Sequence, residues 1–360
     1  MKICLIGNNL TNFVLANVLA NKNLTVDIIF NDEIRKTSKT RTIGISRSNF
    51  YYLKKISKNI PAWPVSNVKI FGTNKNTREL IQFKKDKVEN FYLTKYENIL
   101  SNFKKISQKN NLINIFKTKK KIDENFFQNK NYNLIVNSNP RCNLTKKYCY
   151  RKLEKNYESY AYTTLINHEK IKNNCAFQHF TNHGVLAFLP LSENTTSVVF
   201  SVAKKKTLDE KKILNLIKEF NTYYKILNFY KFEKFGLKFS VMRNYYHKNI
   251  LFFGDVIHKV HPLAGQGFNM TLRDIKNLSL LIDEKLDLGL ELDDTILHQF
   301  QKKTKHLNYI FGLGIDFIYE FFNLDGKLQN NLSKNIFPIL NKKNFLNKYA
   351  TNFGDSGIKI

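Results

Sequence analysis

The first thirty residues alternate between continuous apolar runs and a run with helical spacing. Residues 3–6 form an apolar run that ends at Gly7, a pattern typical of a buried strand. Between residues 11 and 20 the apolar residues recur at helical spacing, and residues 25–30 form a second strand-like run. This order predicts a strand–helix–strand unit of the kind that binds dinucleotides.

A strand–loop–helix pattern follows much later in the chain. Residues 250–253 are apolar and end at Gly254 and Asp255, the loop 261–267 holds a proline and two glycines, and helical spacing begins at Asn269. A carboxylate just past a strand can accept hydrogen bonds from sugar-like hydroxyls. The glycines allow close backbone approach, and the helix N-terminus stabilises a phosphate or negative charge developing on a heterocycle. The pattern therefore predicts a ligand site.

The middle of the chain and its C-terminal part favour other structures. Short β-rich segments separated by turn residues predict an antiparallel sheet, and they span residues 160–166, 176–180, 185–191 and 197–202. Residues 211–224 and 297–322 have the spacing of amphipathic helices. The predicted fold class is therefore α/β, with a nucleotide-binding part, an antiparallel sheet and helices at the end.

Composition and charge add a surface property to this picture. The chain has 360 residues, 42% of them hydrophobic, and a formal net charge of +29. Such a chain can build two domains or one large elaborated domain. Positive charge favours anionic partners, but the lysines are scattered and no nucleic-acid-binding motif is present. Compositional drift and attraction to a membrane surface are the two explanations that stay open.

The cysteines and the apolar runs bear on compartment. Cys4, Cys142, Cys149 and Cys175 show neither a C-x-x-C motif nor metal-ligand spacing, which indicates reduced thiols and no metal site. No apolar run reaches the length of a transmembrane helix, and the N-terminus lacks a signal-peptide pattern. These features predict a cytoplasmic protein, either free or peripheral at the inner face of a membrane.

The string GDVIHKVHPLAGQGFNMTLRD at residues 254–274 resembles the second FAD-binding motif of the aromatic-ring flavin monooxygenases. Its Ala-Gly-Gln-Gly-x-Asn segment and its Arg-Asp pair resemble the ubiquinone-biosynthesis hydroxylase branch of that family. The resemblance implies a discontinuous FAD-binding domain of Rossmann-like fold, built from residues 1–150 and 245–300. It also implies an inserted antiparallel substrate-sheet domain at residues 151–244 and a C-terminal helical region at residues 301–360.

The same resemblance implies an activity and a set of site residues. The protein would be a flavin-dependent monooxygenase that uses FAD and O₂ to hydroxylate a polyprenylated phenol in ubiquinone biosynthesis. Its partners would be this lipid substrate and a membrane or biosynthetic complex, with no nucleic acid. His261 and Pro262 would line the flavin ring near the reacting oxygen. The implied cofactor-binding residues are Gly7, Arg41, Asp255, Gly265, Gln266, Gly267 and Asn269.

Departures from the family pattern leave alternatives open. The G-x-G-x-x-G fingerprint aligns with Gly7, Asn9 and Asn12, and Asn139-Pro140 replaces an acid–glycine pair linked in the family to NAD(P)H. The electron donor is therefore either NAD(P)H or a ferredoxin-type protein. Two alternative functions also follow. One is a catalytically silent homologue that scaffolds a lipid-modifying assembly, and the other is a flavin oxidoreductase acting on another lipid or aromatic.

Overall fold

The N-terminal strand–helix–strand unit forms as predicted in the computed structural model, which describes residues 1–31, 38–72, 79–84, 89–203, 208–260 and 265–327. Strand β1 (Lys2–Ile6), helix α1 (Leu10–Ala20) and strand β2 (Thr25–Asn31) begin and end within one residue of their predicted bounds. All residues of α1 are buried, which explains why apolar side chains occur on every side of this helix.

The unit opens a six-stranded sheet in which every strand except the edge strand β16 runs parallel to its neighbour. The order is β16 (Tyr246–His247), β17 (Ile250–Phe252), β9 (Leu134–Asn137), β1, β2 and β8 (Ile113–Thr118). From β1 the chain moves to β2 and β8 on one side, and it later returns to β9 on the other. The gap between the ends of β1 and β9 is therefore the topological switch point, where ligands of doubly wound sheets bind.

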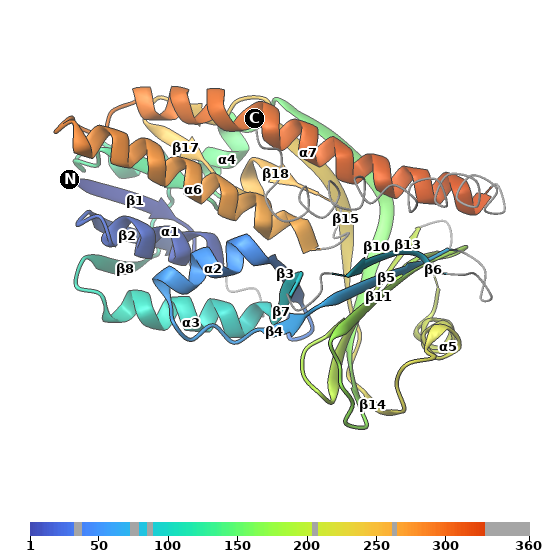
Figure 1. Ribbon diagram of the computed structural model, residues 1–360. Coiled ribbons are helices and arrows are strands. Elements are labelled where there is room, and N and C mark those ends of the chain that lie inside the picture. Colours follow the sequence, from blue (N-terminus) through green and yellow to red (C-terminus); the bar gives the residue numbers. More distant parts are fainter. Residues whose placement is uncertain (32–37, 73–78, 85–88, 204–207, 261–264, 328–360) are drawn as a thin grey trace.

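Helices on both sides of this sheet share one large hydrophobic core with it. Helix α1 packs against α3 and α6, and α6 in turn packs against α7 (Figure 1). The helices of this part of the chain are α2 (Arg47–Ile56), α3 (Tyr96–Lys109), α4 (Asn143–Tyr148), α6 (Gln266–Asp287) and α7 (Thr295–Lys327), and the 3₁₀ turns are η1 (Asn125–Phe127) and η3 (Gly254–Val256). Helix α7 covers the predicted helical stretch 297–322.

A second, mainly antiparallel sheet contains the four β-rich segments predicted from the sequence. In the described residues its strands lie in the order β18 (His258–Lys259), β15 (Glu233–Met242), β10 (Lys152–His168), β13 (Thr195–Ala203), β12 (Gly184–Pro190), β11 (Cys175–Thr181), β5 (Asn67–Phe71) and β6 (Glu79–Lys84), with β14 (Ile226–Phe229) paired to β10. Three of these strands come from outside residues 151–244. At one edge β5 pairs in parallel with β11, and β6 pairs with β5. At the other edge β18 pairs with β15.

Both faces of the antiparallel sheet are covered. Helix α5 (Glu210–Phe220) lies on one face, over a core that includes Tyr162, Phe188, Phe200, Ile213 and Ile217. On the other face, α7 packs against β11 and β15. The small sheet of β3 (Thr42–Ser46), β7 (Phe91–Lys95) and β4 (Trp63–Val65) packs on the same face near β12. Helix α5 ends four residues before its predicted end, because the Asn221 side chain accepts the N–H groups of Tyr223 and Tyr224 and so caps a turn.

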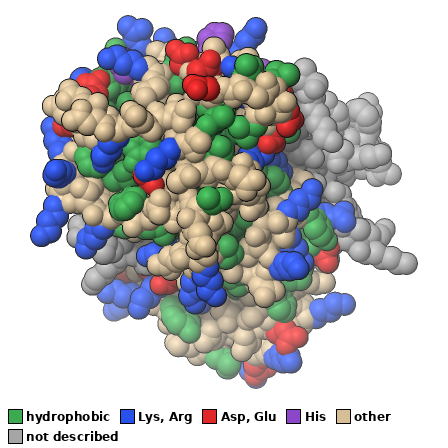
Figure 2. Space-filling view, turned by 90° about the vertical axis from the view of Figure 1, so that its left-hand side faces the viewer, with side chains coloured by type: hydrophobic (Ala, Val, Ile, Leu, Met, Phe, Trp, Pro, Cys, Tyr) green, Lys and Arg blue, Asp and Glu red, His purple; other side chains and the backbone are tan. Residues whose placement is uncertain are grey.

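The positive charge is distributed over the surface. Figure 2 shows Lys and Arg side chains spread across one end of the molecule, with acidic side chains among them and no single basic patch on this face. Among the described helices, none has the length and apolar composition needed to cross a bilayer. The scattered arrangement agrees with the pattern seen in the sequence.

Candidate active site

Three turns meet at the carboxyl edge of the parallel sheet. Since β1, β9 and β17 run in the same direction, their following residues Gly7, Ser138 and Gly254 lie at one edge. Gly7 (φ +124°) and Gly254 (φ +58°) both adopt positive φ. A Cβ atom on Gly254 would lie 3.2 Å from the Thr11 side chain, so glycine allows this turn to sit against the start of α1.

The N-terminus of α6 lies against β3. Gly265 precedes the helix in the left-handed region (φ +64°) and carries no side-chain cap. A Cβ atom there would lie 2.8 Å from the Gly44 nitrogen, so the backbones touch at this point. The Oε1 atom of Gln266, the first helical residue, is buried and has no hydrogen-bond partner among the described residues. Uncapped N–H groups and the helix dipole make this turn attractive to a negatively polarised ligand edge.

Asn269 holds α6 to β3 from inside the protein. Its Oδ1 atom accepts the Ser46 N–H at 2.9 Å and the Asn49 amide at 3.0 Å, and its Nδ2 atom donates to the Gly44 carbonyl at 3.0 Å. Asn269 is 2% exposed and both polar atoms of its side chain bond to protein. The structure therefore places this predicted cofactor residue in the interior, where it also donates to the Gly265 carbonyl at 3.4 Å.

Arg41, Tyr96 and Asp255 form a polar group at the same edge. The Arg41 guanidinium carbon lies 4.4 Å from the centroid of the Tyr96 ring, a cation–π distance. Burial raises the pKa of Tyr96, the positive charge of Arg41 lowers it, and the negative charge of Asp255 raises it. Asp255 itself is exposed in η3. A fixed cation and a free carboxylate thus stand beside the glycine turns.

The segment before Arg41 is tied to the antiparallel sheet through Glu233. The Glu233 carboxylate accepts the Lys39 N–H at 3.0 Å and the Thr40 hydroxyl at 2.8 Å. The Thr40 hydroxyl also lies 2.7 Å from that of Thr163 on β10. Arg41 is therefore positioned where the parallel and antiparallel sheets meet.

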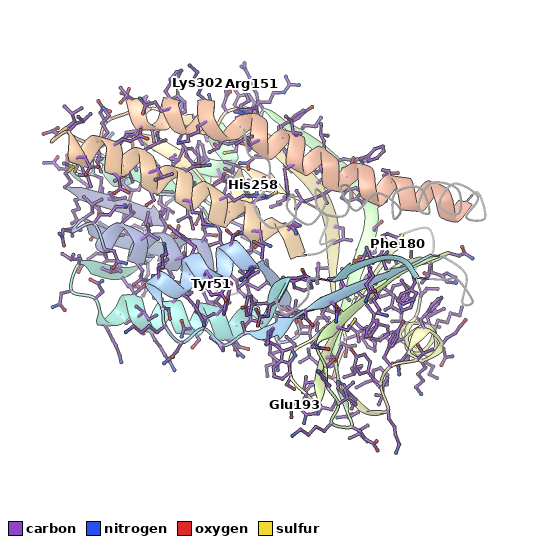
Figure 3. The ribbon with its side chains drawn as sticks, in the orientation of Figure 1. Tyr51, Arg151, Phe180, Glu193, His258 and Lys302 are labelled. Carbon is purple, nitrogen blue, oxygen red and sulfur yellow. The ribbon has the colours of Figure 1, made fainter. Side chains whose placement is uncertain are left out.

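A buried polar group connects the turn after β17 with two helices. His258 Nε2 lies 2.7 Å from Asp274 Oδ2, and both side chains are 1% exposed. Asn308 of α7 donates to both carboxylate oxygens of Asp274, at 3.0 and 3.2 Å. Figure 3 shows His258 in the interior, beneath α7. This group fixes the segment that carries Asp255 to α6 and α7.

The face of the antiparallel sheet opposite α5 carries two buried polar atoms that lack partners. Leu186 and Phe188 of β12 belong to the α5 side, so Ala187 between them faces the other way, and its register partner on β11 is Gln178. Ser197 has the same relation to Val198 on β13. Gln178 Nε2 and Ser197 Oγ have no hydrogen-bond partner among the described residues. They can bind polar groups of a ligand held against this face.

A ring of hydrogen bonds fills the turn between β1 and α1. The Asn9 amide donates to the Ser138 hydroxyl at 2.9 Å, which donates to Asn12 Oδ1 at 2.8 Å. The Asn12 amide donates to the Gly7 carbonyl at 2.8 Å, and Asn9 Oδ1 accepts the Asn12 N–H at 3.1 Å. These two asparagines occupy the second and third positions of the predicted glycine fingerprint.

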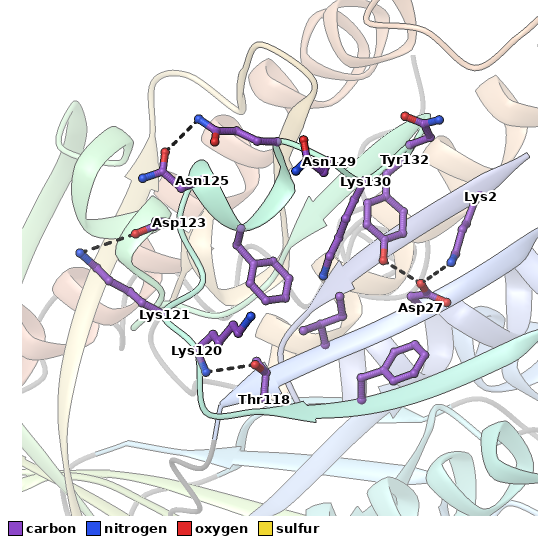
Figure 4. Close-up of a pocket in the computed structure, with 15 residues that line it drawn as sticks. Lys2, Asp27, Thr118, Lys120, Lys121, Asp123, Asn125, Asn129, Lys130 and Tyr132 are labelled. Atoms are coloured by element: carbon purple, nitrogen blue, oxygen red, sulfur yellow. Dashed lines mark hydrogen bonds and ion pairs between the residues drawn. The ribbon is translucent and has the colours of Figure 1, made fainter.

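A hollow of about 1040 Å³ lies elsewhere, between the parallel sheet and the loop that contains η1 (Figure 4). Lys2, Asp27 and Tyr132 lie at one end of it, where Lys2 Nζ and the Tyr132 hydroxyl contact Asp27 at 2.8 and 2.7 Å. None of the residues predicted to bind the cofactor lines this hollow. The candidate site is therefore the carboxyl edge of the parallel sheet.

The predicted residues fall into three groups. Gly7, Arg41, Asp255 and the start of α6 gather at this edge, Asn269 lies behind it, and His261 and Pro262 are outside the described residues. Tyr96 and Ser138 were not predicted, although Ser138 directly precedes the Asn139-Pro140 pair that departs from the family pattern. Within the described ranges no group of His, Cys, Asp and Glu could hold a metal ion.

Comparison with known proteins shows which proteins this chain is similar to. Residues 152–289 match the family model of an FAD binding domain. The chain is 33% identical over 119 residues to a mitochondrial ubiquinone biosynthesis monooxygenase of Dictyostelium discoideum, covering 31% of this chain and 24% of that protein. It is 29% identical over 154 residues to the 3-demethoxyubiquinol 3-hydroxylase of Escherichia coli, covering 41% and 39%. The chain is therefore similar to an FAD binding domain over residues 152–289 and to flavin-dependent monooxygenases over part of its length.

Solved structures of other proteins show the same fold. The structure of p-nitrophenol 4-monooxygenase from Pseudomonas putida aligns over 99% of this chain and 98% of that chain, with a TM-score of 0.80 and 10% identity. The FAD complex of an HpxO variant from Klebsiella pneumoniae aligns over 97% and 98%, with a TM-score of 0.71 and 11% identity. The mixed α/β fold predicted from the sequence is therefore confirmed. The match to an FAD binding domain supports the predicted cofactor FAD.

The carboxyl edge of the parallel sheet fits FAD in most respects. The unpartnered Gln266 oxygen and the uncapped N-terminus of α6 suit the polar edge of the flavin, and the exposed Asp255 suits hydroxyls of the ribityl chain or ribose. Arg41 supplies positive charge for the phosphates. A bound flavin would supply oxygenation chemistry that uses O₂ and electrons from a donor, and Asp255, Arg41 and the start of α6 would hold it.

Proposed function

We propose that this protein catalyses the FAD-dependent hydroxylation of a polyprenylated phenol in ubiquinone biosynthesis. The observation that carries the proposal is the uncapped start of α6, at Gly265 and Gln266, fixed to β3 beside Arg41 and Asp255. One of the named relatives is a ubiquinone biosynthesis monooxygenase, and the other is a 3-demethoxyubiquinol 3-hydroxylase. The chain spans 24% to 54% of the length of the first three curated relatives that it matches, so substrate and activity are proposals for this chain.

In this proposal the chain binds and orients its two ligands and excludes water. Asp255, Arg41 and the start of α6 hold the flavin, and the loop residues His261 and Pro262 line its ring. The phenol lies against the sheet face that carries Gln178 and Ser197, whose free polar atoms bind its oxygen substituents. The long aliphatic part of the substrate extends along apolar surface, where it is removed from water.

The experiment is turnover of a short-chain prenylated phenol in ¹⁸O₂ with the purified protein, its FAD and a reduced ferredoxin, which supplies the two electrons that convert the second oxygen atom to water. Incorporation of one ¹⁸O atom into the ring is the expected result. A protein that releases no flavin on denaturation and takes up no added FAD would contradict the proposal. That outcome would favour the silent scaffold, for which the ring of Asn9, Asn12 and Ser138 in the glycine turn is the supporting observation.

The electron donor in this proposal is a small acidic protein of ferredoxin type. Asn139 has replaced an acid, and its side-chain oxygen accepts the Arg141 N–H at 3.0 Å within its own turn. Its backbone N–H donates to the Asn137 side chain at 2.9 Å, so this turn offers little to a nicotinamide. The net charge of +29 favours an acidic donor, with a rate that falls as salt is raised.

The exposed side of α7 is the surface proposed to contact a membrane. Tyr309, Ile310 and Leu313 are 42%, 52% and 37% exposed, and Lys302 and Lys305 lie one to two turns earlier on the helix. Figure 3 shows Lys302 on the outer side of α7. Apolar and cationic side chains in this order suit an anionic lipid surface, which would also supply a lipid substrate. Co-sedimentation with vesicles containing anionic lipid, reversed by salt, is the expected result.

A further inference from the structure

Asn9, Asn12 and Ser138 join two strand ends that are 129 residues apart in the sequence, and we call these three residues the amide bridge. Asn9 follows β1 and Ser138 follows β9. The Asn9 Nδ2 atom lies 2.9 Å from the Ser138 hydroxyl oxygen and 3.3 Å from its carbonyl oxygen. Ser138 and Asn12 are 2% and 0% exposed, so the bridge is anchored in the core.

The amide bridge crosses the switch point of the parallel sheet. β1 and β9 are direct neighbours, and the chain leaves them in opposite directions across the sheet. In doubly wound sheets of this kind the pyrophosphate of a dinucleotide lies in the crevice at that point, against the first helix. The Asn9 side chain therefore stands where the glycine fingerprint normally leaves room.

The bridge also uses a hydrogen-bond donor that phosphates normally take. The Asn12 N–H, in the first turn of α1, donates to Asn9 Oδ1 at 3.1 Å. The Asn12 side chain is turned inward to the Gly7 carbonyl, at 2.8 Å. With Asn9 in this position, the α1 N-terminus offers fewer free N–H groups to an anion than an open glycine turn does.

We propose that the amide bridge sets how this protein discriminates between flavins. It closes the switch point against the pyrophosphate, so FAD binds fully only after the Asn9 side chain rotates away from Ser138. The start of α6 and Asp255 hold the flavin ring and the ribityl chain, so the amide bridge does not affect the binding of these parts. This inference rests on the proposed function, because it assumes that the carboxyl edge binds FAD.

The test compares FAD with riboflavin, which carries the ring and ribityl chain but no phosphate. Dissociation constants are measured on apoprotein by quenching of flavin fluorescence, for wild type, Asn9→Gly and Ser138→Ala. Glycine is an acceptable N-cap, so Asn9→Gly keeps α1, and thermal unfolding checks this. In wild type, FAD binding must break about one hydrogen bond of the amide bridge, and neither variant has this bond to break. Both variants should therefore bind FAD roughly fivefold more tightly than wild type, with riboflavin binding unchanged. Asn129→Ala, an exposed amide, is the control and changes neither constant.

The outcomes separate this inference from the proposed function. If folded Asn9→Gly and Ser138→Ala bind FAD no more tightly than wild type, the bridge does not restrict FAD, and the proposed function stands. If riboflavin affinity rises as much as FAD affinity, the effect is not at the pyrophosphate and the inference is again wrong. If no form binds either flavin, the proposed function fails as well.

Discussion

Replacing Asn269 with alanine should unfold the cofactor edge from within. The change removes three hydrogen bonds of 2.9 to 3.0 Å, to the Ser46 N–H, the Asn49 amide and the Gly44 carbonyl. These groups meet at a side chain that is 2% exposed, so water does not replace Asn269 without opening the structure. Each buried group that loses its partner costs about 1–3 kcal/mol, so the loss expected for the three groups is at least about 3 kcal/mol.

Equilibrium urea unfolding of wild type, Asn269→Ala and the exposed control Asn129→Ala measures this loss. The urea midpoint of Asn269→Ala falls strongly. The free energy of unfolding of the control changes by no more than about 0.5 kcal/mol. FAD retention at low denaturant falls in parallel, because Asn269 fixes the backbone contact between Gly265 and Gly44. A loss below about 1 kcal/mol would show that β3 and α6 hold together without this side chain, and the positioning role would be wrong.

Further predictions concern pH, cofactor retention and the donor. Burial lowers the pKa of His179 to about 4, below its ordinary value, so its neutral form stabilises the fold above pH 6.5 and this contribution, about 3 kcal/mol, is lost as pH falls towards 4. His179→Phe should flatten that part of a pH–stability curve, and an unchanged slope would contradict the assignment. Asp255→Ala should lower FAD retention at least tenfold, while the exposed Asp287→Ala should not, as gel filtration and flavin absorbance will show; equal losses would refute the mapping. Gln178→Leu should raise KM for the phenol with little change in flavin content, and an unchanged KM would remove Gln178 from the substrate face. Reduction of the bound flavin by NADPH, followed as bleaching in a stopped-flow instrument, should be slow. Rapid and saturable bleaching would contradict the proposal of a ferredoxin-type donor.

The local sequence pattern was sufficient to predict the elements that pack against segments close to them in the sequence. β1, α1 and β2 were predicted to within one residue because continuous burial of strands and of α1 leaves an unbroken apolar signal. Helix α6 begins at Gln266, three residues before its predicted start at Asn269. The polar first turn has no apolar periodicity, and Gly265 in the left-handed region sets the boundary.

Long-range pairing could not be predicted in the same way. β5 pairs in parallel with β11 across more than one hundred residues, and neither strand carries a local mark of its partner. Asn9 and Asn12 were recognised as departures from the glycine fingerprint, but their common partner Ser138 was not. Two amides and a hydroxyl form a ring only after the sheet has placed β9 beside β1.

Strand β10 connects the two ends of the molecule as one continuous element. Its 17 residues span about 56 Å if extended. It pairs with β15 near Lys152 and with β13 up to Asn167, interrupted by a bulge between Asn156 and Ser159. A hinge between the nucleotide-binding and sheet regions would have to break this ladder. We therefore expect the proposed substrate to enter through rearrangement of loops and side chains at the edge. Amide hydrogens along β10 should exchange among the slowest in the protein.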